Sequence, residues 1–405
     1  MNIYFSGIGG VGIGALAQMA LDAGHTIIGS DTEHSLTTEE LLHAGVNVTI
    51  GTQTGETLRQ YHEASHIDWF VYTAALPSVH PELVAARELG IRATKRDALL
   101  AKIIADSDQK LIAVAGTHGK TTTSGMLVWT LQQLGIPISY NVGSQLSFGP
   151  AGKFNPDATY FVYECDEFDR NFLKFSPYTS VIVSIDYDHP DTYPTEQDYT
   201  LAFRDFIAQS HHTILWQHDA EYISLEPTDS AWILQADEVT DFRLPGAHNR
   251  RNATLVAKVL EQLGIDSAHD DVVHALETFP GSKRRFERLG DNLYSDYGHH
   301  PVEIAATLQM AREIADHVVL LYQPHQNIRQ HEVRDQYTEN VFENADKVYW
   351  LPTYLTREDP SLEILTPQQL TTHLFPSTLH ITELNDELWS TLTQLRHDGH
   401  LVLCM

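Results

Sequence analysis

The sequence predicts an α/β protein with three domains in series. A length of 405 residues exceeds what one hydrophobic core usually holds. Apolar strands alternate with helical stretches along the chain, a pattern typical of parallel sheets. Composition breaks near residues 105–110 and 279–282 separate the parts. We expect a Rossmann-like domain over 1–108, a central P-loop ATPase-like domain with a parallel sheet over 109–280, and a Rossmann-like α/β domain over 281–405.

Composition indicates ordinary globular domains. Hydrophobic residues make up 42% and charged residues 20% of the chain, which excludes disorder, and no apolar run predicts a membrane span. The net charge of −28 disfavours nucleic acid and anionic membranes as partners. The chain opens directly into a strand without a signal peptide, and Cys165 and Cys404 show no metal spacing. We therefore expect a cytoplasmic protein.

The first domain opens with a glycine-rich turn. Strands are expected over 3–6, 26–29 and 69–72, and the turn Gly7-Ile-Gly-Gly-Val-Gly12 follows the first of them. An acidic residue about 20 positions on completes the dinucleotide-binding fingerprint, which reports a diphosphate next to a sugar. Taken alone, it leaves an NAD-dependent dehydrogenase open. The predicted ligand-binding residues are Gly7, Gly9, Gly10, Val11, Gly12 and Asp31.

A second strand-to-helix turn, Val114-Ala-Gly-Thr-His-Gly-Lys-Thr-Thr-Thr123, begins the central domain. Backbone N–H groups at the helix start would face phosphates, Lys120 would pair with β and γ oxygens, and the Thr121 hydroxyl would ligate Mg²⁺. Val114 replaces the first glycine of the standard pattern, but strand context, two glycines, the lysine and three threonines favour an ATP site. Its predicted residues are Gly116, Thr117, His118, Gly119, Lys120, Thr121 and Thr122.

Two further strands of this domain end in acidic clusters. The strand over 160–164 ends in Glu164, and the strand over 180–185 leads into a segment containing His189. Ligands of open α/β sheets lie at the carboxyl ends of strands, so both side chains are candidates to face the triphosphate beside Thr121. We predict Thr121, Glu164 and His189 as metal ligands, although Mg²⁺ prefers oxygen. Solvated acidic loops are the alternative.

A helix beginning near His248 carries Asn249 and Asn252 on its first turn. Amide side chains both donate and accept hydrogen bonds, which suits the edge of an adenine. On its own the motif fits a capped helix with surface amides equally well.

The third domain combines a basic turn with two polar strand ends. Lys283-Arg284-Arg285 lies at its entry, and guanidinium groups there suit a γ-phosphate, although a solvated linker remains an alternative. A strand over 293–296, a helix over 301–316 and a strand over 318–322 form the expected βαβ unit. Polar turns follow both strands, and the residues singled out in them are Asp296, Tyr297, His325 and Arg329.

In this order the motifs resemble those of the Mur ligase family of peptidoglycan synthesis, and most closely its alanine-adding members. The likeness spans nearly the whole chain. The motifs that carry it are Gly7-Ile-Gly-Gly-Val-Gly12, Ala115-Gly-Thr-His-Gly-Lys-Thr-Thr122, Glu164-x-Asp-Glu-x-Asp169, His189-x-Asp-Thr-Tyr193, Pro245-Gly-x-His-Asn-x-x-Asn252, Arg284-Arg-Phe286, Asp296-Tyr-Gly-His-His-Pro301 and Gln323-Pro-His325.

The resemblance implies an ATP- and Mg²⁺-dependent ligase that joins UDP-N-acetylmuramate to L-alanine through an acyl phosphate. The first domain would bind the UDP-sugar, the central domain ATP and the third the amine, with domain closure during the reaction. The implied roles are phosphate binding by Lys120, Mg²⁺ binding by Thr121, Glu164 and His189, adenine contact by His248, Asn249 and Asn252, ribose contact by Asp296, γ-phosphate contact by Arg285, UDP-sugar contact also by His118, and contact with the reacting carboxylate and amine by Tyr297, His325 and Arg329.

Three departures from the family pattern affect the choice of amine. Phe168 replaces a usual serine and is more like the murein-tripeptide ligases of cell-wall recycling. One of two expected arginines is missing in Gln323-Pro-His-Gln-Asn-Ile-Arg329. The chain stops at 401–405, in the expected last strand, where relatives continue, so we expect a cut or reduced third domain.

Three other functions remain open from the sequence. A murein-tripeptide recycling ligase is the first, but the segment 171–177 follows the acidic motif without the insertion that those enzymes carry, which favours L-alanine. A non-catalytic nucleotide-binding homologue is the second, because loss of the arginine at Gln326 and a short third domain would disable use of the amine. A dehydrogenase is the third.

Overall fold

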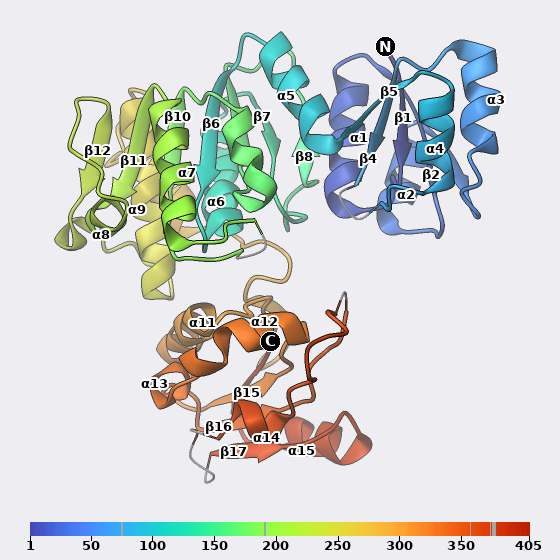
Figure 1. Ribbon diagram of the computed structural model, residues 1–405. Helices are drawn as coiled ribbons and strands as arrows, with labels where there is room; N and C mark the ends of the chain where they lie inside the picture. The colour runs from blue at the N-terminus through green and yellow to red at the C-terminus, as the bar shows by residue number, and fades with distance from the viewer. Residues whose placement is uncertain (74–75, 190–191, 357, 373, 375–377) are drawn as a thin grey trace. The chain divides into compact units, whose positions relative to one another are not determined.

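The computed structural model describes residues 1–73, 76–189, 192–356, 358–372, 374 and 378–405. The chain divides into two compact units: unit 1 is Met1–Val239 with Thr254–Pro280, and unit 2 is Thr240–Ala253 with Gly281–Met405. Unit 1 contains two sheets and unit 2 one (Figure 1). The predicted α/β class with three sheet domains is confirmed, and the boundaries at 108 and 280 stay predictions. No helix in the described part of the chain is long and apolar enough to span a membrane.

The first sheet is parallel, with the strand order β3-β2-β1-β4-β5. Its strands confirm the three predicted from the sequence. Because the order reverses direction at β1, a crevice for ligands is expected beyond the carboxyl end of this strand. The elements are β1 (Asn2–Ser6), α1 (Val11–Asp22), β2 (Thr26–Asp31), α2 (Leu36–His43), β3 (Asn47–Ile50), α3 (Glu56–Ser65), β4 (Trp69–Tyr72), α4 (Pro81–Glu88) and β5 (Arg92–Lys95).

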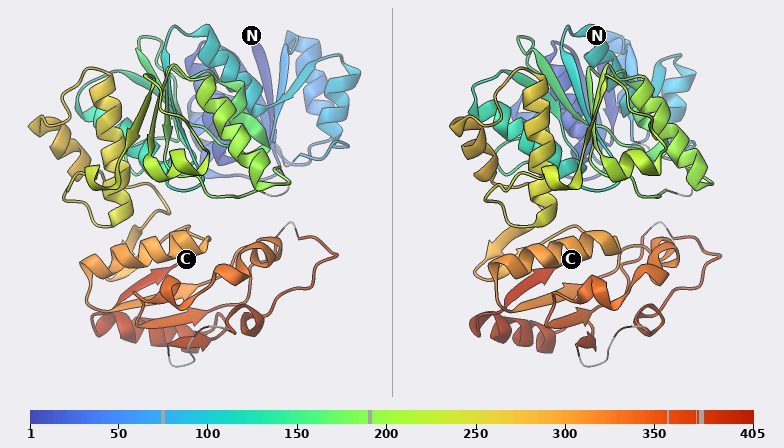
Figure 2. Two further views of the ribbon diagram at one scale, coloured as in Figure 1. Left: turned by 60° about the vertical axis from the view of Figure 1, so that its left-hand side comes forward. Right: turned by 90° about the vertical axis from the view of Figure 1, so that its left-hand side faces the viewer.

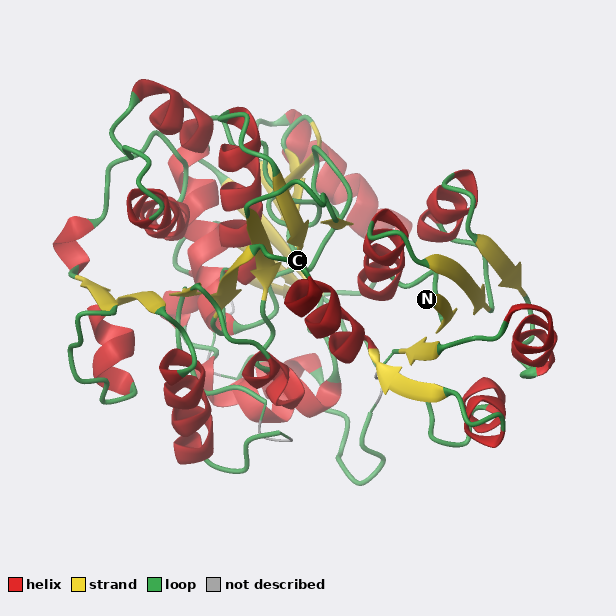
Figure 3. Ribbon diagram, turned by 90° about the horizontal axis from the view of Figure 1, so that it is seen from above, coloured by secondary structure: helices red, strands yellow, loops and turns green. Residues whose placement is uncertain are grey.

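Helices cover both faces of this sheet. Alternate residues of β1 point to opposite sides, so Phe5 packs in the core that contains α1, and Tyr4 in the core that contains α3 and α4. Figure 3 shows the strands near the N terminus with helices on both sides. The first domain is therefore doubly wound, as the alternating pattern predicts.

The second sheet has the order β12-β11-β10-β6-β9-β7-β8, and only the β7–β8 pair is antiparallel. The predicted linker over 105–110 is the end of α5 and the start of β6. The elements are α5 (Arg96–Asp106), β6 (Lys110–Ala115), α6 (Lys120–Gln133), β7 (Ile138–Asn141), β8 (Gly152–Lys153), β9 (Tyr160–Glu164), the 3₁₀ helix η1 (Phe168–Lys174), β10 (Thr179–Ile182), α7 (Glu196–Ala208), β11 (His212–Trp216), α8 (Gln217–Tyr222), β12 (Ala231–Leu234), η2 (Ala236–Glu238), α9 (Ala247–Gln262) and α10 (Asp270–Glu277).

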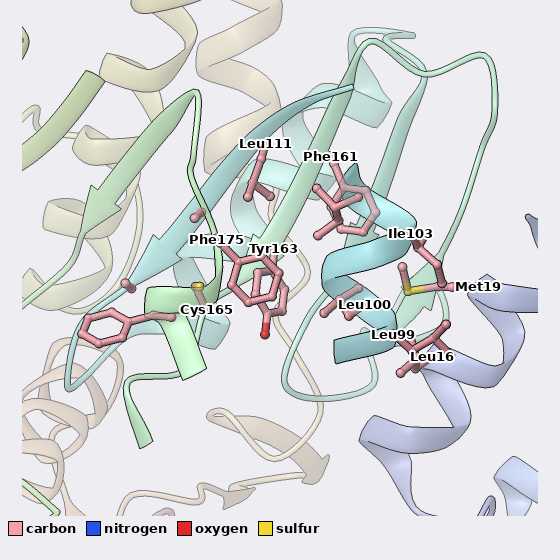
Figure 4. Close-up of a cluster of buried hydrophobic side chains, with 14 of the residues drawn as sticks. Leu16, Met19, Leu99, Leu100, Ile103, Leu111, Phe161, Tyr163, Cys165 and Phe175 are labelled. Atoms are coloured by element: carbon pink, nitrogen blue, oxygen red, sulfur yellow. The ribbon is translucent and has the colours of Figure 1, made fainter. Parts of the chain in front are cut away.

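A continuous apolar core joins the two sheets of unit 1. Figure 4 shows side chains of α1, such as Leu16 and Met19, and of α5, such as Leu99, Leu100 and Ile103, among the buried residues of the cluster. Leu111, Phe161 and Tyr163 of the second sheet belong to the same cluster. Helix α5 therefore connects the first domain to the central one through buried contacts rather than as a free linker.

The sheet of unit 2 has the order β13-β14-β18-β15-β16-β17, with only β13–β14 antiparallel. Helices α11 and α15 lie on its opposite faces, because Leu320 packs with α11 and Val319 with α15 (Figure 2). The predicted helix over 301–316 ends at Ile314. The elements are β13 (Glu287–Gly290), β14 (Leu293–Ser295), α11 (Pro301–Ile314), β15 (Val318–Tyr322), α12 (Asn327–Val333), η3 (Arg334–Gln336), α13 (Glu339–Phe342), β16 (Lys347–Trp350), α14 (Pro367–Leu370), β17 (Leu379–Ile381), α15 (Asp386–His397) and β18 (Leu401–Cys404).

Candidate active site

The first glycine-rich turn connects β1 to α1. Gly7 has φ +76°, a left-handed conformation that favours glycine, and Gly10 caps the helix that begins at Val11. Asp31 accepts hydrogen bonds from the backbone N–H of Gly9 and of Thr32, each at 2.7 Å. The structure therefore brings Asp31 to the turn, and its carboxylate holds the backbone there.

A buried carboxylate, Glu82, lies beneath this turn and was not predicted from the sequence. Glu82 is 1% exposed. It accepts hydrogen bonds from the hydroxyls of Tyr4 at 2.8 Å, Ser6 at 2.5 Å and Ser30 at 2.7 Å. Burial, followed by the charge of Glu82, raises the pKa of the Tyr4 phenol. Ser6 and Ser30 directly precede the glycine turn and Asp31, so Glu82 fixes both segments from below.

The second turn packs tightly against the chain that follows β10. A Cβ at Gly116 would lie 2.6 Å from the backbone oxygen of Ser184, so no larger residue fits there. Thr117 N–H donates to that oxygen at 2.9 Å, and His118 N–H donates to the Ser184 hydroxyl at 2.9 Å. Gly119, with φ +80°, caps α6, which begins at Lys120. Ser184, which the sequence did not single out, orients the turn.

Lys120 lies in an ion pair with Glu167. Its Nζ is 2.8 Å from Glu167 Oε2 and also donates to the Gly116 carbonyl at 2.5 Å. Burial alone would lower the pKa of Lys120, but the negative charges of Glu167 and Asp166 raise it above its usual value. Burial raises the pKa of Glu167 to about 7. The cation predicted for phosphate binding is therefore held in place by a carboxylate of the acidic motif.

Thr121 and Glu164 lie together at the start of α6. The Thr121 hydroxyl donates to Glu164 Oε1 at 2.9 Å, and Gly143 N–H donates to Oε2 at 2.5 Å. Thr122, the next residue, lies in the same first turn of α6. Hydroxyl and carboxylate oxygens are ligands that Mg²⁺ prefers, so this pair fits the predicted metal.

His189 lies beside the Lys120–Glu167 pair. Its Nε2 is 3.9 Å from Glu167 Oε1 and 3.7 Å from Asp188 Oδ2. Its ring contacts Phe168 edge to face at a centroid distance of 5.1 Å. Among the described residues, no group of three or more His, Cys, Asp or Glu side chains is arranged to hold a metal ion. Asp191 of the same predicted motif lies outside the described residues.

In unit 2, the first turn of α9 carries the three residues predicted for adenine. Burial lowers the pKa of His248 to about 4. The Asn249 amide donates to the Pro245 carbonyl at 3.0 Å, and Asn252 is 5% exposed. Arg250 binds Glu313 of α11 through an ion pair at 2.8 Å. This pair holds the turn against α11.

The basic turn and β14 meet around Asp296. This carboxylate accepts hydrogen bonds from Gly298 N–H at 2.6 Å and Phe286 N–H at 2.8 Å. Burial raises the pKa of Asp296. The guanidinium carbons of Arg284 and Arg285 lie 4.1 Å and 5.8 Å from the centroid of the Tyr297 ring. Asp296 thus organises the two segments that carry Arg285 and Tyr297.

The remaining predicted residues lie at the other strand end of unit 2. The ring of His325 is 6.4 Å from that of Tyr297 and stacks on Tyr354 at 5.5 Å. The Arg329 guanidinium contacts Nε2 of His299. Burial lowers the pKa of His299. His299 and Tyr354 were not predicted, although His299 stands within a motif that the sequence analysis quoted.

Comparison with known proteins agrees with this arrangement. Residues 2–108 match the Mur ligase family catalytic domain, and residues 114–231 match the Mur ligase middle domain. A UDP-N-acetylmuramate--L-alanine ligase of Nocardioides is 33% identical over 90% of this chain and 83% of the relative. The same-named protein of Clavibacter michiganensis is 30% identical over 100% of this chain and 90% of the relative.

Solved structures show the same fold. The crystal structure of UDP-N-acetylmuramate-alanine ligase MurC from Thermotoga maritima matches with a TM-score of 0.76 at 23% identity, covering 100% of this chain and 95% of that one. A murein peptide ligase from Psychrobacter arcticus matches with a TM-score of 0.66 at 22% identity and the same coverage. The chain therefore belongs to the Mur ligase family.

Proposed function

We propose that this protein is an ATP-dependent ligase that joins the carboxyl group of UDP-N-acetylmuramate to the amino group of L-alanine. Relatives that it matches over more than four fifths of their length carry the name of this activity. The observation that carries the proposal most directly is the P-loop turn, in which Lys120 and the Thr121–Glu164 pair lie at one helix start. We place the reaction in the cytoplasm, as a step of peptidoglycan synthesis.

Unit 1 supplies the UDP-sugar site and the phosphate site. The turn from Gly7 to Gly12 offers backbone N–H groups at the start of α1 to the diphosphate. Lys120 binds the β and γ oxygens of ATP after exchanging its contact with Glu167 for the phosphates. Thr121 and Glu164 would bind one Mg²⁺ ion, and His189 would bind a second. Bound Mg²⁺ would neutralise charge on the transferred phosphoryl group.

The reaction proceeds in two steps. The muramyl carboxylate attacks the γ-phosphorus of ATP, which forms an acyl phosphate and releases ADP. The amine then attacks the acyl carbon, and inorganic phosphate leaves from the tetrahedral intermediate. The protein contributes mainly positioning and charge stabilisation, with Lys120 and Arg285 as cations.

Unit 2 supplies the groups for the nucleoside and the amine. His248 and Asn249, which are half-buried, and Asn252, which is buried, present a polar turn suited to an adenine. In the cluster of Tyr297, His299 and Arg329, the guanidinium is a bidentate donor suited to the carboxylate of an amino acid.

Phosphate release tests the proposal. Purified protein is incubated with ATP, Mg²⁺ and UDP-N-acetylmuramate, and L-alanine, glycine, L-serine and the murein tripeptide are added in turn. We expect release that requires both UDP-N-acetylmuramate and an amine and is fastest with L-alanine. Release that is fastest with the tripeptide would indicate a recycling ligase, and no substrate-dependent release would overturn the proposal.

A further inference from the structure

Arg96 lies against the first glycine-rich turn. It is the first residue of α5 and directly follows β5. A Cβ built on Gly12 would overlap Nη1 of Arg96 and lie 3.3 Å from its Cζ. The guanidinium therefore occupies space over the first turn of α1 that is available only because residue 12 lacks a side chain.

Packing of the two helices fixes this position. Leu16 and Met19 of α1 and Leu99 and Leu100 of α5 belong to one buried cluster (Figure 4). Arg96 stands at the carboxyl end of β5, on the side of a parallel sheet where ligands bind. The Arg96 guanidinium therefore reaches the glycine-rich turn from a segment that is distant in sequence.

Arg96 has an acidic neighbour, Asp97, and its Nη1 lies beside the glycine-rich turn. The ion pair of Arg96 with the buried Asp97 joins Nε to Oδ1 at 3.6 Å. The adjacent Lys95 extends to Asp169 of the acidic motif, with Nζ 2.5 Å from Oδ2. Lys95 therefore contacts the acidic motif, whereas Arg96 contacts the glycine-rich turn.

The ion pair with Asp97 stabilises the Arg96 cation, but the two helix N-termini around its guanidinium do not. Arg96 lies at the N-terminus of its own helix and against the N-terminus of α1, where the helix dipoles disfavour positive charge. An anion at the turn removes this conflict, because backbone N–H groups and a guanidinium then both donate to it. In a chain of net charge −28, such a local cation favours binding of a diphosphate.

We propose that Arg96 binds the diphosphate of the UDP-sugar substrate, an inference that rests on the proposed function. Its planar guanidinium donates to phosphate oxygens while the N–H groups of the α1 turn donate from the other side. A side chain at residue 12 would displace the guanidinium from this position.

Binding measurements with a matched control test this assignment. Arg96→Gln removes the charge and keeps most of the stem, and Arg96→Lys keeps the charge without the bidentate geometry. Arg92→Gln is the control, because Arg92 stands on the preceding strand, β5, with its guanidinium 3.6 Å from the centroid of the Trp69 ring. Affinities for UDP and UDP-N-acetylmuramate are measured by calorimetry, and the affinity for uridine by ligand-detected NMR.

We expect Arg96→Gln to weaken binding of UDP and UDP-N-acetylmuramate by about ten-fold or more, the loss typical of a hydrogen bond to a charged group. Arg96→Lys should lie between Arg96→Gln and wild type. Uridine affinity, the KM for ATP and the melting temperature of the protein alone should stay near wild type. Arg92→Gln should bind all three ligands like wild type.

Two results would overturn the assignment. One is UDP affinity of Arg96→Gln within two-fold of wild type, and the other is an equal loss for UDP and uridine, which a structural role would produce. Both leave the ligase function standing, since the wild-type protein still binds and turns over. A wild-type protein that binds neither UDP nor UDP-N-acetylmuramate would contradict the proposed function itself.

A double-mutant cycle supplies an independent check. Gly12→Ala should weaken UDP binding by displacing the guanidinium, and the combination with Arg96→Gln should be little weaker than the stronger single variant. Fully additive losses would overturn the link between Gly12 and Arg96.

Discussion

Lys120 and Glu167 form a buried pair in which one partner is a predicted phosphate ligand. Glu167 is 1% exposed, so removal of the ammonium alone would leave a buried carboxylate without its cation. A test of Lys120 therefore needs a variant that also neutralises Glu167. Lys120→Met combined with Glu167→Gln keeps the pair close in size and uncharged.

We expect both Lys120→Ala and the double variant to lower ATP turnover at least 100-fold, because loss of one preorganised cation costs about 3 kcal/mol in the transition state. ATP turnover is measured as phosphate release in the presence of UDP-N-acetylmuramate and L-alanine. Lys102→Ala, which removes only an exposed pair with Asp106, is the control. If the double variant folds and its turnover is near that of wild type, Lys120 does not bind the phosphates.

Arg329 is the guanidinium of the altered segment after β15, where Gln326 has a left-handed φ of +62°. Because Gln326 offers only neutral hydrogen bonds, Arg329 should carry most of the recognition of the amino-acid carboxylate. We expect Arg329→Lys to raise the KM for L-alanine strongly and to leave those for ATP and UDP-N-acetylmuramate within a few-fold. Equal increases for all three substrates would indicate a structural role through the contact with His299.

At the scale of elements, Glu82 ties α4 to β1 and β2. Glu82→Leu would leave the buried hydroxyls of Tyr4, Ser6 and Ser30 without their acceptor, so we expect a loss of about 3 kcal/mol or more in the free energy of unfolding. Urea denaturation measures this loss. Glu88→Gln on the same helix, which breaks an exposed pair with Arg59, should cost less than about 1 kcal/mol. Similar costs for the two variants would contradict the role of Glu82.

The first turn of α9 should make stability depend on pH. Burial lowers the pKa of His248 from 6.5 to about 4, so the unfolded chain binds a proton first as the pH falls. The free energy of unfolding should therefore decrease between pH 6.5 and pH 4, by up to about 3 kcal/mol, and the contribution is fully present above pH 6.5.

His248→Asn should flatten this part of the stability profile, measured by urea denaturation at a series of pH values. His269→Asn, in which an exposed histidine is replaced, should retain the wild-type slope. An unchanged slope in His248→Asn would show that other groups cause the acid sensitivity.

At the scale of the whole molecule, the first domain should select uridine nucleotides over nicotinamide. Lys120, Glu164 and His189, the predicted catalytic groups of unit 1, lie around the P-loop turn, and none of them is a hydride-transfer site. In a thermal-shift titration we expect UDP-N-acetylmuramate to stabilise the protein by about 2.7 kcal/mol at 100 times its Kd. NAD and NADP should give no shift, and a shift with NAD alone would contradict the assignment.

Most of the fold followed from local pattern. The strand pattern predicted β1, β4, β9 and β15 to within one residue, because buried parallel strands are short apolar runs bounded by turn residues. The predicted strand over 180–185 is shorter in the structure, where β10 ends at Ile182. The Ile185 N–H instead donates to Asp219, a contact distant in sequence.

By itself the sequence determined the fold class, the family and the two glycine-rich turns, since each depends on spacing between neighbouring residues. Only the tertiary structure decided what the charged side chains contact. The pairing of Lys120 with Glu167, the burial of Glu82 beneath the first turn and the position of Arg96 over Gly12 join segments 47 to 84 residues apart. Such contacts depend on how helices pack across a sheet, which periodicity within one segment does not encode.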